Sequence, residues 1–145
     1  MKPIALIPHY NHGATLATVC TALRAHGLPV LVIDDGSNVA DLAAARELAA
    51  HDPAITLLER AHNGGKGAAV KDGIHWATQQ GYSHALQIDA DGQHDFADIP
   101  RFLAAGQQHP DALICGRPVY SADAPKSRLY GRKISNFWIW INTGS

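Results

Sequence analysis

The chain has 145 residues, which is enough for one domain with a buried core, and its 46% hydrophobic and 17% charged residues are typical of a globular protein. The formal net charge of −1 gives no overall electrostatic reason to bind nucleic acid. No apolar run reaches the length of about 18 residues that a membrane-spanning helix needs, and the N-terminal run is too short for a signal peptide. We therefore expect a cytoplasmic protein that binds no nucleic acid and does not span a membrane.

Apolar runs that predict strands alternate along the chain with segments that predict helices. Strands are expected over residues 4–7, 30–33, 55–58, 85–88 and 112–115, and helices over residues 15–26, 41–50, 99–108 and from the glycine-rich turn near 65 to about 80. Val70, Ile74 and Ala77 are expected to face inward from the third helix. The run at 85–88 resembles a buried strand. Together the elements predict an α/β sandwich with a mostly parallel sheet.

Acidic residues follow two of the predicted strands. Asp34 and Asp35 come directly after one strand, and Asp89 and Asp91 come after another. The carboxyl ends of parallel strands meet at one edge of a sheet, where ligands of α/β proteins bind. Carboxylates there suit Mg²⁺ or Mn²⁺ together with the phosphates of a substrate. Because Asp and Gly also mark turns, the alternative is an Asp-rich turn that caps the next helix.

A glycine-rich segment, residues 63–67, precedes the third predicted helix. Its glycines would let the backbone approach a phosphate, the helix N-terminus offers free N–H groups, and Lys66 adds a positive charge. It is not a Walker A loop, because Gly67 stands where that loop has Ser or Thr. The alternative is a glycine-rich helix start with an exposed lysine. With the two acidic strand ends, however, the segment predicts a site for a nucleoside diphosphate and a metal ion.

The C-terminal part of the chain is basic and aromatic. Five of the 12 Lys and Arg residues fall within 117–133, and Ile134, Phe137, Trp138 and Ile141 follow at helical spacing. Such a helix can lie at a membrane surface. The alternative is an ordinary packing helix whose cover is missing.

Cysteines and histidines do not indicate a metal site. Cys20 and Cys115 lie far apart, and their apolar neighbours suit small, buried, reduced residues. The nine histidines form no pair or set with the spacing of zinc ligands. We expect most of them at the surface.

Four segments resemble, in order, the signatures of family 2 glycosyltransferases with the GT-A fold. They are Pro-His-Tyr-Asn at 8–11, Ile-Asp-Asp-Gly-Ser at 33–37, Asn-Gly-Gly-Lys-Gly-Ala-Ala at 63–69 and Asp-Ala-Asp-Gly-Gln-His at 89–94. The resemblance is strongest to the branch that transfers mannose or glucose to polyprenyl (dolichyl) phosphate. It implies metal-assisted, inverting transfer of a sugar from a UDP- or GDP-linked donor to a polyprenyl phosphate or another cell-envelope glycolipid precursor. It also implies a location at the inner face of the cytoplasmic membrane.

Carried over by position, the resemblance implies roles for individual residues. The donor nucleotide would be bound by Pro8, Tyr10, Asn11, Asp34, Asp35, Gly36, Lys66, Gly67, Asp89, Ala90 and Asp91. Asp89 and Asp91 would be catalytic, and with Gln93 they would hold a Mg²⁺ or Mn²⁺ ion that stabilises the leaving diphosphate. The acceptor phosphate would be bound by Arg117, Arg132 and Ser135.

Two departures from the family pattern stand out. His12 occupies a position where the family often has Glu, and such enzymes usually continue well beyond residue 145. We therefore expect residues 1–116 to form the donor-binding domain of a larger enzyme and 117–145 to begin the acceptor side, so that this chain alone turns over poorly. The alternatives are a nucleotidyltransferase that forms an NDP-sugar, and a nucleotide-binding fragment that self-associates without turnover. The base, the sugar and the acceptor stay undecided.

Overall fold

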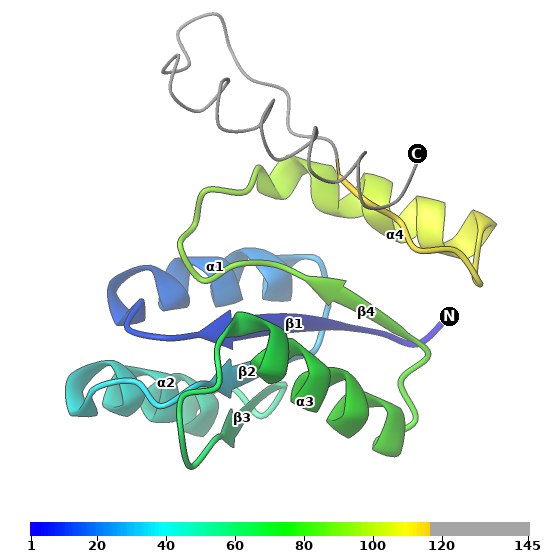
Figure 1. Cartoon of the computed structure of the whole chain (residues 1–145). Coiled ribbons are helices and arrows are strands. Elements are labelled where there is room, and N and C mark those ends of the chain that lie inside the picture. The colour runs from blue at the N-terminus through cyan, green and yellow to red at the C-terminus, as the bar shows by residue number, and fades with distance from the viewer. Residues whose placement is uncertain (117–145) are drawn as a thin grey trace, which may run out of the picture. The chain divides into compact units, whose positions relative to one another are not determined.

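The computed structural model describes residues 1–116, and its helices and strands all lie in one compact unit, Met1–Ile114 (Figure 1). The elements are β1 (Pro3–His9), α1 (Gly13–Ala25), β2 (Val30–Asp34), α2 (Val39–His51), β3 (Ile55–Glu59), α3 (Lys66–Gln79), β4 (His84–Gln87), the 3₁₀ helix η1 (Phe96–Asp98) and α4 (Ile99–Gln108). The strands form a parallel sheet in the order β3-β2-β1-β4. The predicted α/β fold with a parallel sheet is confirmed.

Helices cover both faces of this sheet (Figure 1). Residues of α1, α2 and α4 form one apolar cluster with one face, and residues of α3 form a second cluster with the other face. Residues 4–7 of β1 and 30–33 of β2 are therefore buried from both sides, which explains why they are continuously apolar. The predicted inward face of α1 is also buried, at Leu16, Val19, Cys20 and Leu23.

The strand register places three strand ends at one edge of the sheet. His9 at the end of β1 pairs with Asp34 at the end of β2, which in turn pairs with Glu59 at the end of β3. α1 and α2 start from this edge, and so does α3 after the glycine-rich segment. The loops that carry the predicted site residues therefore share one end of the sheet, as expected for parallel strands.

Two strand predictions need correction. The apolar run 112–115 forms no strand in the described part of the chain, and Leu113 is 89% exposed. An apolar run of four residues forms a strand only where another backbone lies beside it to complete the ladder. The strand at 84–87 is formed, but it lies at the edge of the described sheet, where Ala85 and Gln87 are exposed.

The predicted inward face of α3 is only partly correct: Ala77 is buried as predicted and Val70 is partly buried, but Ile74 is not. Ile74 is 49% exposed, and the buried residues are Ala69, Gly73 and Ala77. The reason is the close approach of α3 to the sheet, since a Cβ atom on Gly73 would lie 2.8 Å from Cδ1 of Ile33. Only small residues fit there, so the larger Ile74 faces outward.

The prediction that both cysteines are buried is only partly correct. Cys20 is buried, and this burial, with the nearby charge of Asp52, raises the pKa of its thiol to about 11. Cys115, by contrast, is exposed. The prediction that most histidines lie at the surface is confirmed, since all but His9 and His84 are exposed. His9 is buried, with 1% of its surface exposed.

Predictions for residues 117–145, including the amphipathic helix, lie outside the described residues. In the described part, no helix is long and apolar enough to cross a membrane.

Candidate functional site

A hollow of about 340 Å³ opens at the edge of the sheet where β1 and β2 end. That volume is within the range of about 300–1,000 Å³ that small-molecule sites occupy. It is lined by Pro8, His9, Tyr10, His12, Asp35, Asn63, Gly65, Lys66, Ala69, Asp89, Ala90 and Asp91. The ends of three strands and the N-terminus of α3 thus form one candidate site, as the motif positions predict.

The carboxylate of Asp35 forms one wall of the hollow. It is 3% exposed and accepts hydrogen bonds from the backbone N–H groups of Gly64, at 2.9 Å, and Gly65, at 2.7 Å. The guanidinium of Arg60 contacts it as well. Gly65 has a φ of +86°, a conformation that favours glycine and that turns the chain into α3. Asp35 therefore holds the glycine-rich segment against the end of β2, and its carboxylate is a hydrogen-bond acceptor in the lining of the hollow.

Lys66 and Asp89 form an ion pair on the wall that α3 and the end of β4 share. The Nζ atom of Lys66 lies 2.6 Å from Oδ1 and 2.7 Å from Oδ2 of Asp89. Burial raises the pKa of Asp89, but the hydrogen bond and charge of Lys66, helped by Gln87 and His94, outweigh it and leave the pKa lowered. The carboxylate is consequently ionised at neutral pH and already holds one cation.

Asp91 stands at the turn that follows. Its Oδ1 accepts a hydrogen bond from the backbone N–H of Gln93 at 3.0 Å, across Gly92, whose φ is +71°. This bond holds the side chain in place and leaves Oδ2 without a protein partner among the described residues. The side chain of Gln93 does not line the hollow.

The donor atoms of Asp89 and Asp91 fit a hard divalent cation such as Mg²⁺ or Mn²⁺. They are oxygen ligands on the wall of one hollow, beside a lysine that suits phosphate. Within residues 1–116, however, no group of three His, Cys, Asp or Glu side chains could hold a metal ion. Two protein carboxylates with phosphate oxygens from a substrate are the usual arrangement for Mg²⁺, so the remaining ligands would come from the substrate and water.

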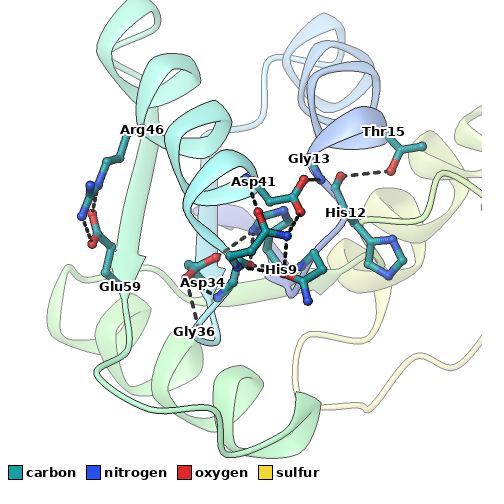
Figure 2. Close-up of polar contacts among 12 residues, drawn as sticks. His9, His12, Gly13, Thr15, Asp34, Gly36, Asp41, Arg46 and Glu59 are labelled. Atoms are coloured by element: carbon teal, nitrogen blue, oxygen red, sulfur yellow. Dashed lines mark hydrogen bonds and ion pairs between the residues drawn. The ribbon is translucent and has the colours of Figure 1, made fainter.

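Asp34, which the resemblance assigns to the nucleotide, lies outside the hollow. Its Oδ1 is 2.9 Å from Nδ1 of His9, and its Oδ2 accepts from the N–H groups of Gly36 and Ser37 at 3.2 and 3.1 Å (Figure 2). Burial raises the pKa of Asp34, but the hydrogen bonds from Ser37 and His9 lower it by more. The structure thus uses Asp34 to join the ends of β1 and β2.

Asn11 also holds the protein together. It has a φ of 56°, and its Oδ1 accepts hydrogen bonds from the backbone and side-chain nitrogens of Asn38 at 2.8 and 3.0 Å. Asn38 is the residue that caps α2, so Asn11 ties the loop after β1 to the start of that helix. Gly36 and Gly67 do not line the hollow either. Arg117, Arg132 and Ser135 lie outside the described residues.

Sequence reasoning missed two parts of this site. The sequence places His9 among the expected surface histidines, although its position just after the apolar run 4–7 is a signal for burial, and the structure pairs it in register with Asp34. Its Nε2 atom is buried and has no partner in the described structure. No sequence pattern predicts a role for Arg60, the partner of Asp35, because neither periodicity nor a motif distinguishes it from other arginines.

Comparison with known proteins identifies the family. The model of glycosyl transferase family 2 matches residues 4–143. Polyprenol monophosphomannose synthase of Mycolicibacterium smegmatis is 34% identical over 122 residues, which are 81% of this chain and 46% of that protein. Undecaprenyl-phosphate mannosyltransferase of Micrococcus luteus is 36% identical over 110 residues, which are 72% of this chain and 44% of that protein. The chain spans less than half the length of these two relatives.

A solved structure has the same fold. It is a mannosyltransferase from Pyrobaculum calidifontis in complex with GDP-Man and Mn²⁺, with a TM-score of 0.54 and 24% identity, covering 62% of this chain and 27% of that one. This likeness supports the GT-A type of α/β fold. With a family match over nearly the whole sequence, the chain belongs to glycosyltransferase family 2.

Proposed function

We propose that the enzyme transfers mannose from GDP-mannose to a polyprenyl phosphate and that residues 1–116 bind the donor. The observation that carries this proposal is that Asp35, Lys66, Asp89 and Asp91 all line the same hollow. The mannosyltransferase names of two relatives and the GDP-Man and Mn²⁺ of the structural neighbour support the choice of sugar, base and metal. Transfer itself is proposed for the whole protein.

We assign a part of the donor to each wall of the hollow. Asp35 offers an acceptor for an N–H or O–H group of the nucleoside, next to Pro8 and the exposed ring of Tyr10. Lys66 and the N-terminus of α3 favour the negative charge of the diphosphate. Asp89 and Asp91 would hold Mg²⁺ or Mn²⁺, which supplies positive charge that stabilises the leaving nucleoside diphosphate when bound.

For the transfer step, residues 1–116 would need to supply little beyond the binding of the donor and the metal. An oxygen of the acceptor phosphate attacks the anomeric carbon, the bond from that carbon to the diphosphate oxygen breaks, and GDP leaves with the electron pair. One displacement of this kind inverts the anomeric centre. Because a phosphate acceptor is ionised at neutral pH, no strong base is required. The binding of the acceptor by Arg117, Arg132 and Ser135 stays a prediction, as does a peripheral position at the membrane.

Calorimetric titration tests the proposal. Purified chain is titrated with GDP and with UDP, each with and without Mn²⁺, and the series is repeated on Asp91→Asn. We expect GDP to bind more tightly when Mn²⁺ is present, and Asp91→Asn to weaken that binding by about tenfold or more, since changes even in the outer ligand shell cost that much. The control is Asp98→Asn, an exposed carboxylate in η1 that pairs with Arg101 and does not line the hollow.

Two results would contradict the proposal. One is the binding of neither nucleotide, and the other is nucleotide binding that responds neither to Mn²⁺ nor to the change at Asp91. Tighter binding of UDP than of GDP would mean that the donor carries uridine instead of guanosine, and the proposal of a glycosyltransferase would stand.

A further inference from the structure

Arg60 lies between the candidate site and a second hollow of about 470 Å³. The second hollow is bounded by the end of β3 and by α3, and Arg60 and Asp72 are among the residues that line it. The backbone N–H of Arg60 donates to the carbonyl of Asp34 at 2.9 Å and so continues the pairing of β3 with β2. Arg60 does not line the first hollow, so in this position it has no direct access to a ligand there.

The guanidinium of Arg60 joins two carboxylates from different elements. Its Nη1 contacts Oδ1 of Asp35 at the end of β2, and its Nε donates to Oδ2 of Asp72 on α3 at 2.7 Å. The side chain of Arg60 is only 19% exposed. Both bonds are charge-assisted, and a rigid planar guanidinium fixes the spacing of the groups that it joins. Arg60 therefore sets the position of Asp35 relative to α3, the helix that begins with Lys66.

The glycine-rich segment is fitted to this guanidinium. A Cβ atom on Gly64 would lie 2.8 Å from Nη1 and 2.9 Å from Nη2 of Arg60, so a side chain at that position would displace the arginine. The Oδ1 atom of Asp35 accepts from both Gly64 and Arg60, whereas within residues 1–116 its Oδ2 atom accepts only from Gly65. Since each carboxylate oxygen can accept about two hydrogen bonds, Oδ2 keeps one free acceptor position.

From these contacts we infer that Arg60 is a positioning residue for the nucleoside end of the donor site. It occupies one oxygen of Asp35 and thereby directs the other oxygen to an N–H or O–H group of the nucleoside. It also holds Asp35 at a set distance from the diphosphate end, where Lys66 and Asp89 lie. This inference rests on the proposed function, because it needs a nucleotide in the hollow.

A matched control comes from the same end of β3. Arg46 makes two hydrogen bonds to Glu59, at 2.8 and 2.6 Å, and joins α2 to β3 away from the hollow (Figure 2). The Arg46–Glu59 pair resembles the Arg60 pairs in chemistry, although it lies on the α2 side of β3 and the Arg46 side chain is 60% exposed. It contacts no residue that lines the first hollow by any hydrogen bond among the described residues.

The test is a double-mutant cycle on nucleotide affinity. The dissociation constant of GDP or UDP, whichever the wild-type chain binds more tightly with Mn²⁺, is measured for Arg60→Met, Asp35→Asn, the double variant and Arg46→Met. We expect Arg60→Met to weaken binding about tenfold, the scale of one charge-assisted hydrogen bond, in the wild-type background. In the Asp35→Asn background the same change should have an effect of less than about twofold, because coupled residues do not act additively. Arg46→Met should leave affinity unchanged.

A further variant keeps the test valid if Arg60→Met does not fold. Asp72 is about half exposed, so Asp72→Asn removes the outer anchor of Arg60 without opening the core. It should weaken nucleotide binding in the wild-type background and have little effect with Asp35→Asn. Equal losses in both backgrounds, or no loss at all in a folded variant, would overturn the role of Arg60. If the wild-type chain binds neither nucleotide, the proposed function fails, and this inference fails with it.

Discussion

Replacing Lys66 with methionine should change metal and nucleotide binding in opposite directions. Nζ of Lys66 contacts both oxygens of Asp89, so a divalent cation that binds Asp89 would compete with it. On the proposed function, the diphosphate of the donor would give Lys66 a new anionic partner and would free Asp89 for the metal. Lys66→Met should therefore strengthen the binding of Mn²⁺ alone and weaken the binding of the nucleotide.

The size of each effect follows from exposure. The side chains of Lys66 and Asp89 are 55% and 32% exposed, so solvent screens their ion pair, and such pairs contribute about 0–1 kcal/mol. Loss of this competitor should tighten Mn²⁺ binding by up to about fivefold. A hydrogen bond from a charged group is worth about 1.5–3 kcal/mol. Subtracting the ion pair that must first be broken leaves about 0.5–3 kcal/mol, so the nucleotide should bind about 2- to 150-fold more weakly.

Calorimetry or electron paramagnetic resonance of Mn²⁺ can separate the effect on metal binding from the effect on nucleotide binding. Mn²⁺ is titrated first without nucleotide, and the nucleotide is then titrated at saturating Mn²⁺. Lys71→Met is the control, because Lys71 is an exposed lysine on α3 that does not line the hollow. The reasoning is refuted if Lys66→Met weakens Mn²⁺ binding in the absence of nucleotide, or if nucleotide affinity stays at the wild-type value.

Three further predictions concern stability and reactivity. The pKa of Asp34 is lowered by folding from its unfolded value of 3.8, so this carboxylate stabilises the fold above that pH, and the free energy of unfolding should fall as the pH drops through the folded pKa. Asp34→Asn should reduce this fall in urea titrations at pH 2–6. An unchanged pH profile in the variant would contradict the prediction. Gly73→Val should destabilise the protein by about 2–3 kcal/mol, because it overpacks the space next to the sheet. At Gly67, a Cβ atom would meet no described atom within 4 Å beyond its chain neighbours and its own helix backbone, so Gly67→Ala should stabilise α3 by about 0.5 kcal/mol. Equal effects of the two changes on the urea midpoint would refute the packing argument. In a Cys115→Ser background, Cys20 should react with a thiol reagent at pH 8 only after unfolding, and rapid labelling of the native chain would show that its thiol is accessible.

Much of the fold could be predicted because it depends on local patterns. The buried runs at 4–7 and 30–33 have no polar residue, which is the pattern of strands covered on both faces. Asp35 directly follows β2, and Asp89 and Asp91 come shortly after β4, so parallel strands bring these residues to one edge. The hollow at that edge is consistent with this reasoning, although the ligand roles of these residues stay predictions.

Other features depend on distances between elements that no local pattern contains. Gly73 and not Ile74 faces the sheet, because α3 packs too closely for a large side chain. Periodicity gives the direction of a residue on a helix but not the space that a neighbouring element leaves for it. The run at 112–115 shows the same limit, since a strand needs a partner backbone that an apolar run alone does not provide.

The sequence alone therefore determined the parallel α/β architecture and the gathering of acidic residues and Lys66 at one sheet edge. Only the tertiary structure decided what each polar residue there does. Asp34 and Asn11 belong to motifs of the site, yet their side chains bond to other parts of the protein, while Arg60, outside any motif, holds Asp35 in place. The physical reason is that a polar side chain bonds to whichever partner folding brings within about 3 Å, and that partner is often distant in the sequence.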